Sequence, residues 1–147
     1  MTQYNQTDLL GGAIVLAMVS EVYQGWTLVD LRRLFVPPIT LGQFYSFREK
    51  SGDLTGFITW ANLTMDAELG FINRTRTLQP SDWSAGDHSR LWCIDALAPY
   101  GGVGPMVRHV VKDLREKANA GGWPCDRASW ARSYGAGKVQ HIGKVMR

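Results

Sequence analysis

The sequence predicts one mixed α/β domain, and three observations predict it. The chain has 147 residues, which is the size of a single domain with a sizeable core. Hydrophobic residues make up 45% and charged residues 20%, the balance of a folded globule and not of a disordered segment. Stretches of helical and strand periodicity follow in the order helix, helix, hairpin, helix, strand, helix, strand. Without a repeat or linker, residues 1–147 are assigned to one domain.

The first helix is predicted over residues 8–23, where apolar side chains recur at helical spacing. Thr7 or Asp8 can cap its start. The apolar run inside it, residues 11–19, is too short to cross a bilayer, which takes about 20 residues. The stretch before it carries an acid and no base, so we expect neither a signal peptide nor a membrane span.

A second, short helix is predicted from Thr27 to Leu34. Thr27 followed by Asp30 fits a capping box, in which each side chain bonds the backbone N–H of the other residue. Pro37 and Pro38 are expected to stop this helix, because a proline disfavours helical backbone in the residue before it.

A hairpin and a third helix follow. Residues 43–50 and 54–60 are predicted strands, and the Ser51-Gly52-Asp53 turn joins them. Residues 64–73 form the predicted third helix, with Thr64 as its cap.

The later part of the chain contains a strand, a glycine-rich turn, a helix and another strand. Residues 91–97 are mostly apolar, which is typical of a strand buried on both faces. After a turn at residues 100–104, Pro105 fits the first position of a helix that ends near Ala118. Residues 127–134 alternate with a period of two and predict a half-exposed strand.

The glycine turn is the first candidate site. Gly101, Gly102 and Gly104 precede a helix, and backbone N–H groups at a helix N-terminus bind anions such as the phosphate of a nucleotide, coenzyme A or a phosphopantetheine arm. The turn matches neither a P-loop nor a dinucleotide fingerprint. A tight structural turn explains the spacing at least as well.

Asp95 is the second candidate, because it interrupts an otherwise apolar strand. A buried carboxylate is costly unless it is paired or used, and such residues are often functional. The alternative is a carboxylate that holds a nearby backbone group or arginine in place. The residue pattern alone weighs the two equally.

No metal site is predicted. The three histidines, His88, His109 and His141, share no ligand motif, and each is expected to be structural or exposed. The two cysteines, Cys93 and Cys125, exclude a disulfide scaffold and a cysteine-based zinc cluster, and we expect reduced thiols.

The charge is unevenly distributed. The net charge is +3, but all 13 acids lie at or before Asp126, and residues 127–147 carry five bases and no acid. Such an end suits an acidic or phosphate-bearing partner, although a solvated tail explains it as well. No run of bases and no pattern of bases between aromatics indicates nucleic-acid binding.

Several short pieces of the chain occur in the order of one protein family. They are Leu10-Gly11, Trp26, Trp60-Ala61-Asn62-Leu63-Thr64, Asp82-Trp83-Ser84-Ala85-Gly86-Asp87, Ile94-Asp95-Ala96-Leu97-Ala98-Pro99-Tyr100-Gly101 and Gly137-Lys138-Val139. With these pieces the chain resembles the toxin-activating lysine acyltransferases, the activators of RTX protoxins. The resemblance covers nearly the whole chain.

The resemblance implies both a fold and an activity. The fold would be like that of the GCN5-related N-acetyltransferases, a mixed sheet flanked by helices. The activity would be transfer of a fatty acyl group from acyl carrier protein, through its phosphopantetheine thioester, to a lysine of a protoxin-like protein. No tightly bound cofactor is implied, and family members tend to be cytoplasmic homodimers. Most of the six tryptophans are expected in the core and some along an acyl pocket.

The resemblance also points to catalytic positions. The family's aspartate is Asp95 and its active-site serine is Ser20, but Tyr23 stands where the family has a histidine. Tyrosine, with a pKa of about 10, is a poor base near neutral pH. Three interpretations follow: Tyr23 donates a proton or polarises an oxyanion with Asp95 as the base, His88 reaches the site, or catalysis is lost.

Two hypotheses result. The first is an acyltransferase that uses Asp95, Tyr23 and Ser20, with Gly101, Gly102 and Gly104 holding the donor's arm. The second is a lapsed member that binds or serves as a structural part of a larger assembly, for example a phage particle, because the family histidine is replaced.

Overall fold

The computed structural model describes residues 5–125, 127–134 and 138–145. Its helices are α1 (Gln6–Met18), α2 (Leu28–Leu41), α3 (Met65–Asn73) and α4 (Val103–Gly121), with short 3-10 helices η1 (Glu21–Tyr23) and η2 (Pro80–Ser84). Its strands are β1 (Phe44–Arg48), β2 (Leu54–Asn62), β3 (Leu91–Leu97), β4 (Arg127–Tyr134) and β5 (Lys138–Val145). The mixed α/β class expected from the sequence is confirmed.

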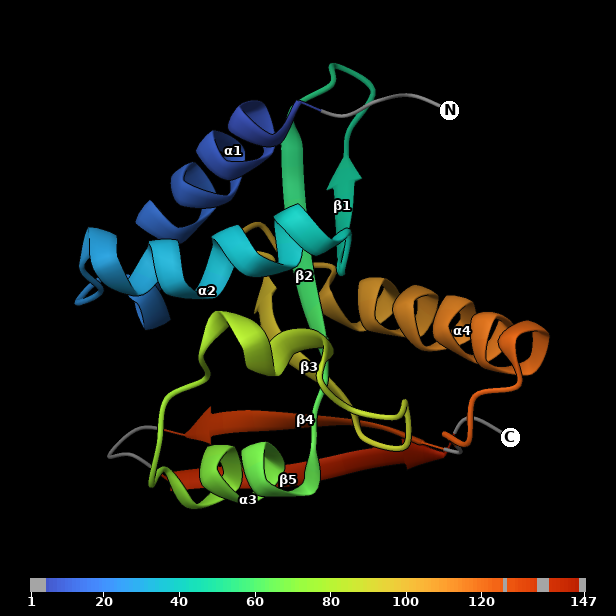
Figure 1. Ribbon diagram of the computed structural model, residues 1–147. Helices are drawn as coiled ribbons and strands as arrows, with labels where there is room; N and C mark the ends of the chain where they lie inside the picture. Colours follow the sequence, from blue (N-terminus) through green and yellow to red (C-terminus); the bar gives the residue numbers. More distant parts are fainter. Residues whose placement is uncertain (1–4, 126, 135–137, 146–147) are drawn as a thin grey trace.

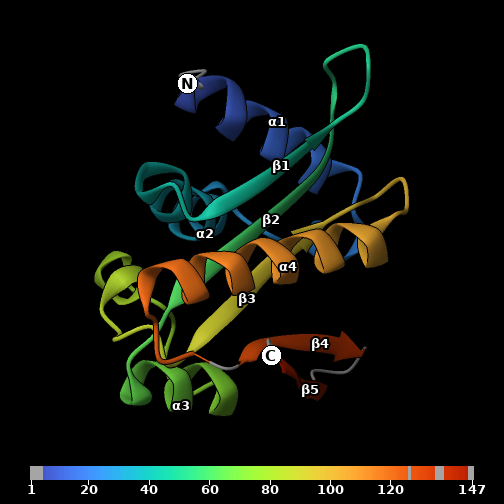
Figure 2. The ribbon, with the colours of Figure 1, turned by 90° about the vertical axis from the view of Figure 1, so that its right-hand side faces the viewer.

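The strands form one sheet in the order β1-β2-β3-β4-β5. All neighbours are antiparallel except β3 and β4, which run parallel and are joined through α4. In Figure 2, α4 lies across the face of the sheet that is turned toward the viewer, and α1 and α2 lie on the opposite face. The sheet is therefore flanked by helices on both faces, as Figure 1 also shows.

The parallel pair β3–β4 is short. Only residues 91–93 pair with residues 128–130, and β3 then continues to Leu97 without β4 beside it. The two strands diverge beyond that point (Figure 2). A parallel pair that separates in this way leaves a split in the sheet, into which side chains from both faces can project.

Three apolar clusters fill the core. One lies between α4 and the sheet and contains Val110 and Leu114. The second lies under α1 and α2 and contains Leu9 and Phe35. The third lies under α3 and contains the fully buried Trp83. Burial of these apolar surfaces is the main driving force that holds the helices on the sheet.

The first helix differs from the prediction at both ends. Asn5 is its cap and accepts from the N–H of Thr7 at 2.9 Å, so neither Thr7 nor Asp8 caps it. The helix ends at Met18, and η1 carries the chain on to Tyr23. The Ser20 hydroxyl donates to the Leu16 carbonyl at 2.8 Å while the Ser20 backbone is extended, which ends the helical path.

The second helix does not stop at its prolines, so that prediction was wrong. The Thr27–Asp30 capping box is present, but Pro37 and Pro38 lie inside α2, which runs on to Leu41. Both prolines and Ile39 are buried. Burial of this apolar turn offsets the two lost backbone donors, and Gly42 in left-handed conformation (φ 72°) ends the helix.

The remaining elements follow the prediction in kind and order, but some of their ends differ, and η2 and β5 were not predicted. The hairpin, the third helix with its Thr64 cap, and the strand at 127–134 are all present. However, α4 begins at Val103, so Pro105 is its third residue, where the backbone N–H has no helical partner anyway. The sequence pattern missed β5, where Gly143 interrupts a weak alternation. β3 is not buried on both faces, because Ala96 is exposed.

Within the described residues, no helix combines the length and apolarity that crossing a bilayer needs. Cys93 and Cys125 are both free thiols, as expected.

Candidate active site

A cavity of about 1140 Å³ occupies the split between β3 and β4. Its walls come from η1 and α2, from the end of α3 and the loop at residues 74–78, from residues 93–96 of β3, from the first turns of α4, and from Trp130 of β4. Helices on both faces of the sheet therefore contribute to it. Ligand pockets typically measure about 300–1000 Å³, so this space can hold an extended ligand.

A β-bulge decides where Asp95 points. Ile58 pairs with Ala96 and Trp60 with Cys93, so β3 has one more residue than β2 over this stretch. The Asp95 N–H donates at 3.1 Å to the Thr59 hydroxyl. Bulges re-aim side chains, and they are frequent beside active sites.

The effect of the bulge is visible in the packing. Cys93 packs with the α4 cluster, whereas Leu97, four residues on, packs under α1 and α2. In a regular strand, residues 93, 95 and 97 would share one face. The bulge instead places Asp95 on the side of η1, where Tyr23 lies.

Asp95 and Tyr23 form the centre of the site. The Tyr23 hydroxyl donates to Asp95 Oδ1 at 2.9 Å, and both residues line the cavity. Asp95 is only 7% exposed, and its Oδ2 has no hydrogen-bond partner among the described residues. Tyr23 is held by Trp26, whose ring meets it edge-on at 4.5 Å between centroids. One carboxylate oxygen is thus bonded to Tyr23, and the other is buried without a hydrogen-bond partner among the described residues.

Burial sets the protonation of this pair. Burial raises the pKa of Asp95 to about 6, although the hydrogen bond from Tyr23 opposes this rise. Burial, and then the Asp95 charge, holds the pKa of Tyr23 well above its usual value, so Tyr23 stays protonated and acts as a donor. The same two causes raise the pKa of the Cys93 thiol to about 12, which removes it as a thiolate nucleophile. Of these three groups, Asp95 has the pKa nearest to neutral.

The glycine turn reaches the cavity only in part. Gly104 and Val103 line it, whereas Gly101 and Gly102 do not. Gly101 (φ 92°) and Gly102 (φ 81°) have the left-handed conformation that favours glycine, and Gly102 is the residue before α4. These two glycines therefore turn the chain, and the N–H groups of Val103 and Gly104 are the ones presented at the helix N-terminus.

The other two predicted residues lie outside the cavity lining. Ser20 is the residue before η1, and its carbonyl accepts from the Tyr23 N–H at 3.1 Å, so it supports Tyr23 through the backbone. His88 stacks on Trp123 at 4.2 Å between ring centroids and is not part of the wall. The structure thus brings Tyr23 to Asp95 and does not bring His88 there.

Sequence reasoning missed several wall residues. Arg33 and Phe71 were predicted only to lie in helices, and no motif in the loop at residues 74–78 indicated a functional site. Trp26 was noticed as one of the family's pieces and Trp130 as one of six tryptophans, of which Trp83 and Trp92 are buried in the core, but neither was placed at the site. No local pattern predicts which of these residues meet, because they come from separate elements.

Comparison with known proteins identifies a family that matches most of this chain. The model of the RTX toxin acyltransferase family matches residues 2–132. The chain is 31% identical over 114 residues to the leukotoxin-activating lysine-acyltransferase LtxC of Aggregatibacter actinomycetemcomitans, covering 78% of this chain and 66% of that protein. It is 30% identical over 106 residues to the RTX-II toxin-activating lysine-acyltransferase ApxIIC of Actinobacillus pleuropneumoniae, covering 72% and 64%.

A further relative is the protein-lysine myristoyltransferase HlyC of Escherichia coli, which is 28% identical over 117 residues, covering 80% of this chain and 67% of that protein. The matches thus span about two thirds of the relatives' own lengths. The matching segment contains the bulged strand, the glycine turn and the Tyr23–Asp95 pair. With a family model that matches most of its length, the chain belongs to the RTX toxin acyltransferase family.

Proposed function

We propose that this protein transfers a fatty acyl group from the phosphopantetheine thioester of acyl carrier protein to a lysine side chain of a protein substrate. One observation carries the proposal: a buried carboxylate lies in a cavity between two diverging strands, with one oxygen held by Tyr23 and the other unpaired among the described residues. The names of the relatives, which describe lysine acyltransferases and myristoyltransferases, support the reaction class.

Asp95 would be the general base. The acceptor amine must lose a proton to form an amide, and Asp95 Oδ2 accepts it as the nitrogen attacks the thioester carbon. The C–S bond then breaks, and the proton passes to the leaving thiolate. A base with a pKa of about 6 is ionised at neutral pH and still accepts a proton usefully. Tyr23 keeps the carboxylate oriented through its bond to Oδ1.

The donor's arm would enter from the α4 side. Free N–H groups at the α4 N-terminus suit a phosphate, and a Cβ built at Gly104 would lie 3.6 Å from Arg108 Nη1, so a guanidinium is close by. In α/β sheets, ligands bind beyond the carboxyl ends of parallel strands. The parallel pair, its crossover helix and its split support a fold like that of the GCN5-related N-acetyltransferases.

The wider setting follows from the relatives. Two of them are named as toxin activators, and we therefore propose a protoxin-like acceptor, a cytoplasmic location and a homodimeric state, without a tightly bound cofactor. The acidic acyl carrier protein suits the chain's net charge of +3.

The direct test is amide formation. The full chain is incubated with labelled myristoyl-acyl carrier protein and a candidate protoxin, and mass spectrometry identifies acylated lysines. We expect transfer, with a loss of about 10²–10⁴-fold for Asp95→Asn. Asp53→Asn, at an exposed acid of the β1–β2 turn, is the matched control and should retain the rate. Full activity of Asp95→Asn would exclude Asp95 as the base.

The second candidate, a lapsed binding protein, is favoured by the tyrosine at the family's histidine position. Tyr23→His discriminates between the two. If the natural protein is inactive and the variant gains transfer, the chain has lost catalysis. If the natural protein already transfers the acyl group, the lapsed alternative is excluded.

A further inference from the structure

We propose that the part of the cavity between α2, α3 and β3 holds the acyl chain, and that Leu34 and Phe71 set the chain length accepted. This inference rests on the proposed acyl transfer. It names a binding branch within the same cavity, distinct from the α4 side that would hold the donor's arm.

The floor of this branch is apolar. Leu34, Phe71, Leu78 and Ile94 all line the cavity, and all belong to or pack against the core cluster under α3. Phe71 is fixed from below by Trp92, whose ring it meets edge-on at 5.3 Å between centroids. A hydrocarbon chain gains about 0.8 kcal/mol for each CH₂ group buried on such a surface.

The bulge connects this floor to the reacting centre. Because β3 carries an extra residue there, Ile94 and Asp95 follow each other on the α1–α3 side of the sheet instead of alternating. Ile94 therefore begins an apolar path directly beside the carboxylate. A thioester carbon placed at Asp95 would have its alkyl chain continue over Ile94 toward Leu34 and Phe71.

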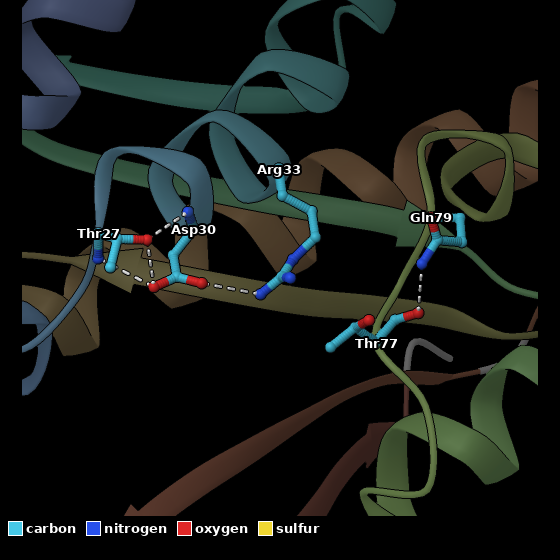
Figure 3. A network of polar contacts seen from close by, with 5 residues as sticks. All are labelled: Thr27, Asp30, Arg33, Thr77 and Gln79. Atoms are coloured by element: carbon cyan, nitrogen blue, oxygen red, sulfur yellow. Dashed lines mark hydrogen bonds and ion pairs between the residues drawn. The ribbon is translucent and has the colours of Figure 1, made fainter.

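Three arginines, Arg33, Arg74 and Arg76, line this side of the cavity, and the charged heads of Arg33 and Arg76 are bonded to acids. Arg33 bonds Asp30 Oδ1 through Nη2 at 3.1 Å, within the network of the α2 capping box (Figure 3). Asp30 does not line the cavity. Nη2 of the charged head is thus directed to an acid outside the cavity, whereas Arg33 Nε is buried without a hydrogen-bond partner among the described residues.

Arg76 is arranged in the same way. Its guanidinium binds Asp66 and Asp82, neither of which lines the cavity. Its stem lies against Gly70, where a Cβ would come within 2.5 Å of Arg76 Cγ, so glycine at position 70 lets the stem pack on α3. The loop between these contacts is further held by Gln79 Nε2, which donates to the Thr77 carbonyl at 3.4 Å (Figure 3).

The two sides of the cavity therefore suit the two parts of one donor. An acyl thioester has a polar, phosphate-bearing arm on one side of the reacting carbon and a hydrocarbon chain on the other. The α4 side offers helix N–H groups, and the α2–α3 side offers an apolar floor. Asp95 lies between them, so we assign the hydrocarbon chain of the donor to the α2–α3 side.

The experiment compares acyl donors of increasing chain length on acyl carrier protein, with rates of lysine acylation as the readout. Leu34→Phe narrows the branch, and we expect the ratio of kcat/KM for palmitoyl over octanoyl donors to fall by about tenfold. Phe71→Ala widens it and should raise that ratio. Leu69→Ala, on the exposed face of α3 and outside the cavity lining, is the matched control and should leave the ratio unchanged.

The outcomes separate this inference from the proposed function. If the natural protein transfers no acyl group, the proposed function fails. If it transfers and both folded variants keep the natural chain-length profile, or lose all donors equally, the acyl branch lies elsewhere and the inference is overturned. Should Leu34→Phe fail to fold by circular dichroism, the Phe71→Ala profile decides.

Discussion

At the scale of single residues, Asp95 is a carboxylic acid whose burial makes its ionised form unfavourable. Burial disfavours its charged form and raises its pKa to about 6, above the value of an exposed aspartate. In the unfolded chain the Asp95 carboxyl ionises near pH 4. Between about pH 4 and pH 6 the folded protein therefore keeps this carboxyl protonated, whereas the unfolded chain has released the proton. The contribution of this group to stability therefore falls as the pH rises through that window.

Asp95→Asn removes this titration. Relative to the natural protein, the variant should gain up to about 3 kcal/mol in the free energy of unfolding between pH 4 and pH 7. Urea denaturation at both pH values measures the difference. A variant whose advantage is the same at both pH values would show that the carboxylate is not desolvated.

Tyr23 acts on the same group through its hydrogen bond. The bond stabilises the ionised carboxylate and lowers the pKa of Asp95. In Tyr23→Phe the pKa should rise, so the lower inflection in the pH dependence of kcat/KM should move above about pH 6. If the rate falls while the inflection stays in place, Tyr23 acts by some route other than this bond.

At the scale of elements, the bulge in β3 is the decisive feature. It depends on one side chain of the neighbouring strand, because the Asp95 N–H has the Thr59 hydroxyl as its acceptor. Thr59 is fully buried, so no solvent can replace that oxygen. Without the bulge, Asp95 would share the α4 face with Cys93 and could not reach Tyr23.

Thr59→Val tests this dependence. Leaving the Asp95 N–H without a partner should cost about 1–3 kcal/mol of stability and lower kcat more than it raises KM for the donor. Thr59→Ser keeps the acceptor oxygen and should restore kcat. Equal losses in both variants would mean that the side chain matters for its packing and not for holding the bulge.

At the scale of the whole molecule, charge and cavity serve different parts of the proposed reaction. The chain carries a net charge of +3 with an acid-free end, and its proposed donor is an acidic protein. Long-range attraction of this kind is screened beyond about 8 Å at physiological ionic strength. In the proposed reaction, the cavity itself recognises the phosphopantetheine arm and the acyl chain of the donor at short range.

Raising the salt concentration should therefore lower kcat/KM for acyl-acyl carrier protein, while the rate with a free acyl-pantetheine donor changes little. Initial rates across a salt series with both donors measure this. Equal salt dependence for the two donors would place the effect of salt on the enzyme itself and contradict electrostatic attraction of the carrier protein.

The sequence determined much of the local structure. Periodicity and capping residues predicted the hairpin, α3 with its Thr64 cap and the Thr27–Asp30 box, because these depend on neighbours along the chain. They failed where packing outweighs local preference. α2 passes through Pro37 and Pro38 because that turn is buried in the core.

For the site, the sequence by itself determined that Asp95 is a carboxylate in an apolar strand and that Tyr23 stands at the end of the opening helical region. The tertiary structure alone decided that the two meet. A bulge is a mismatch between two strands, and a cavity is the space between elements that are distant in sequence. Neither is visible in one segment, because each exists only once strand register and helix packing are fixed.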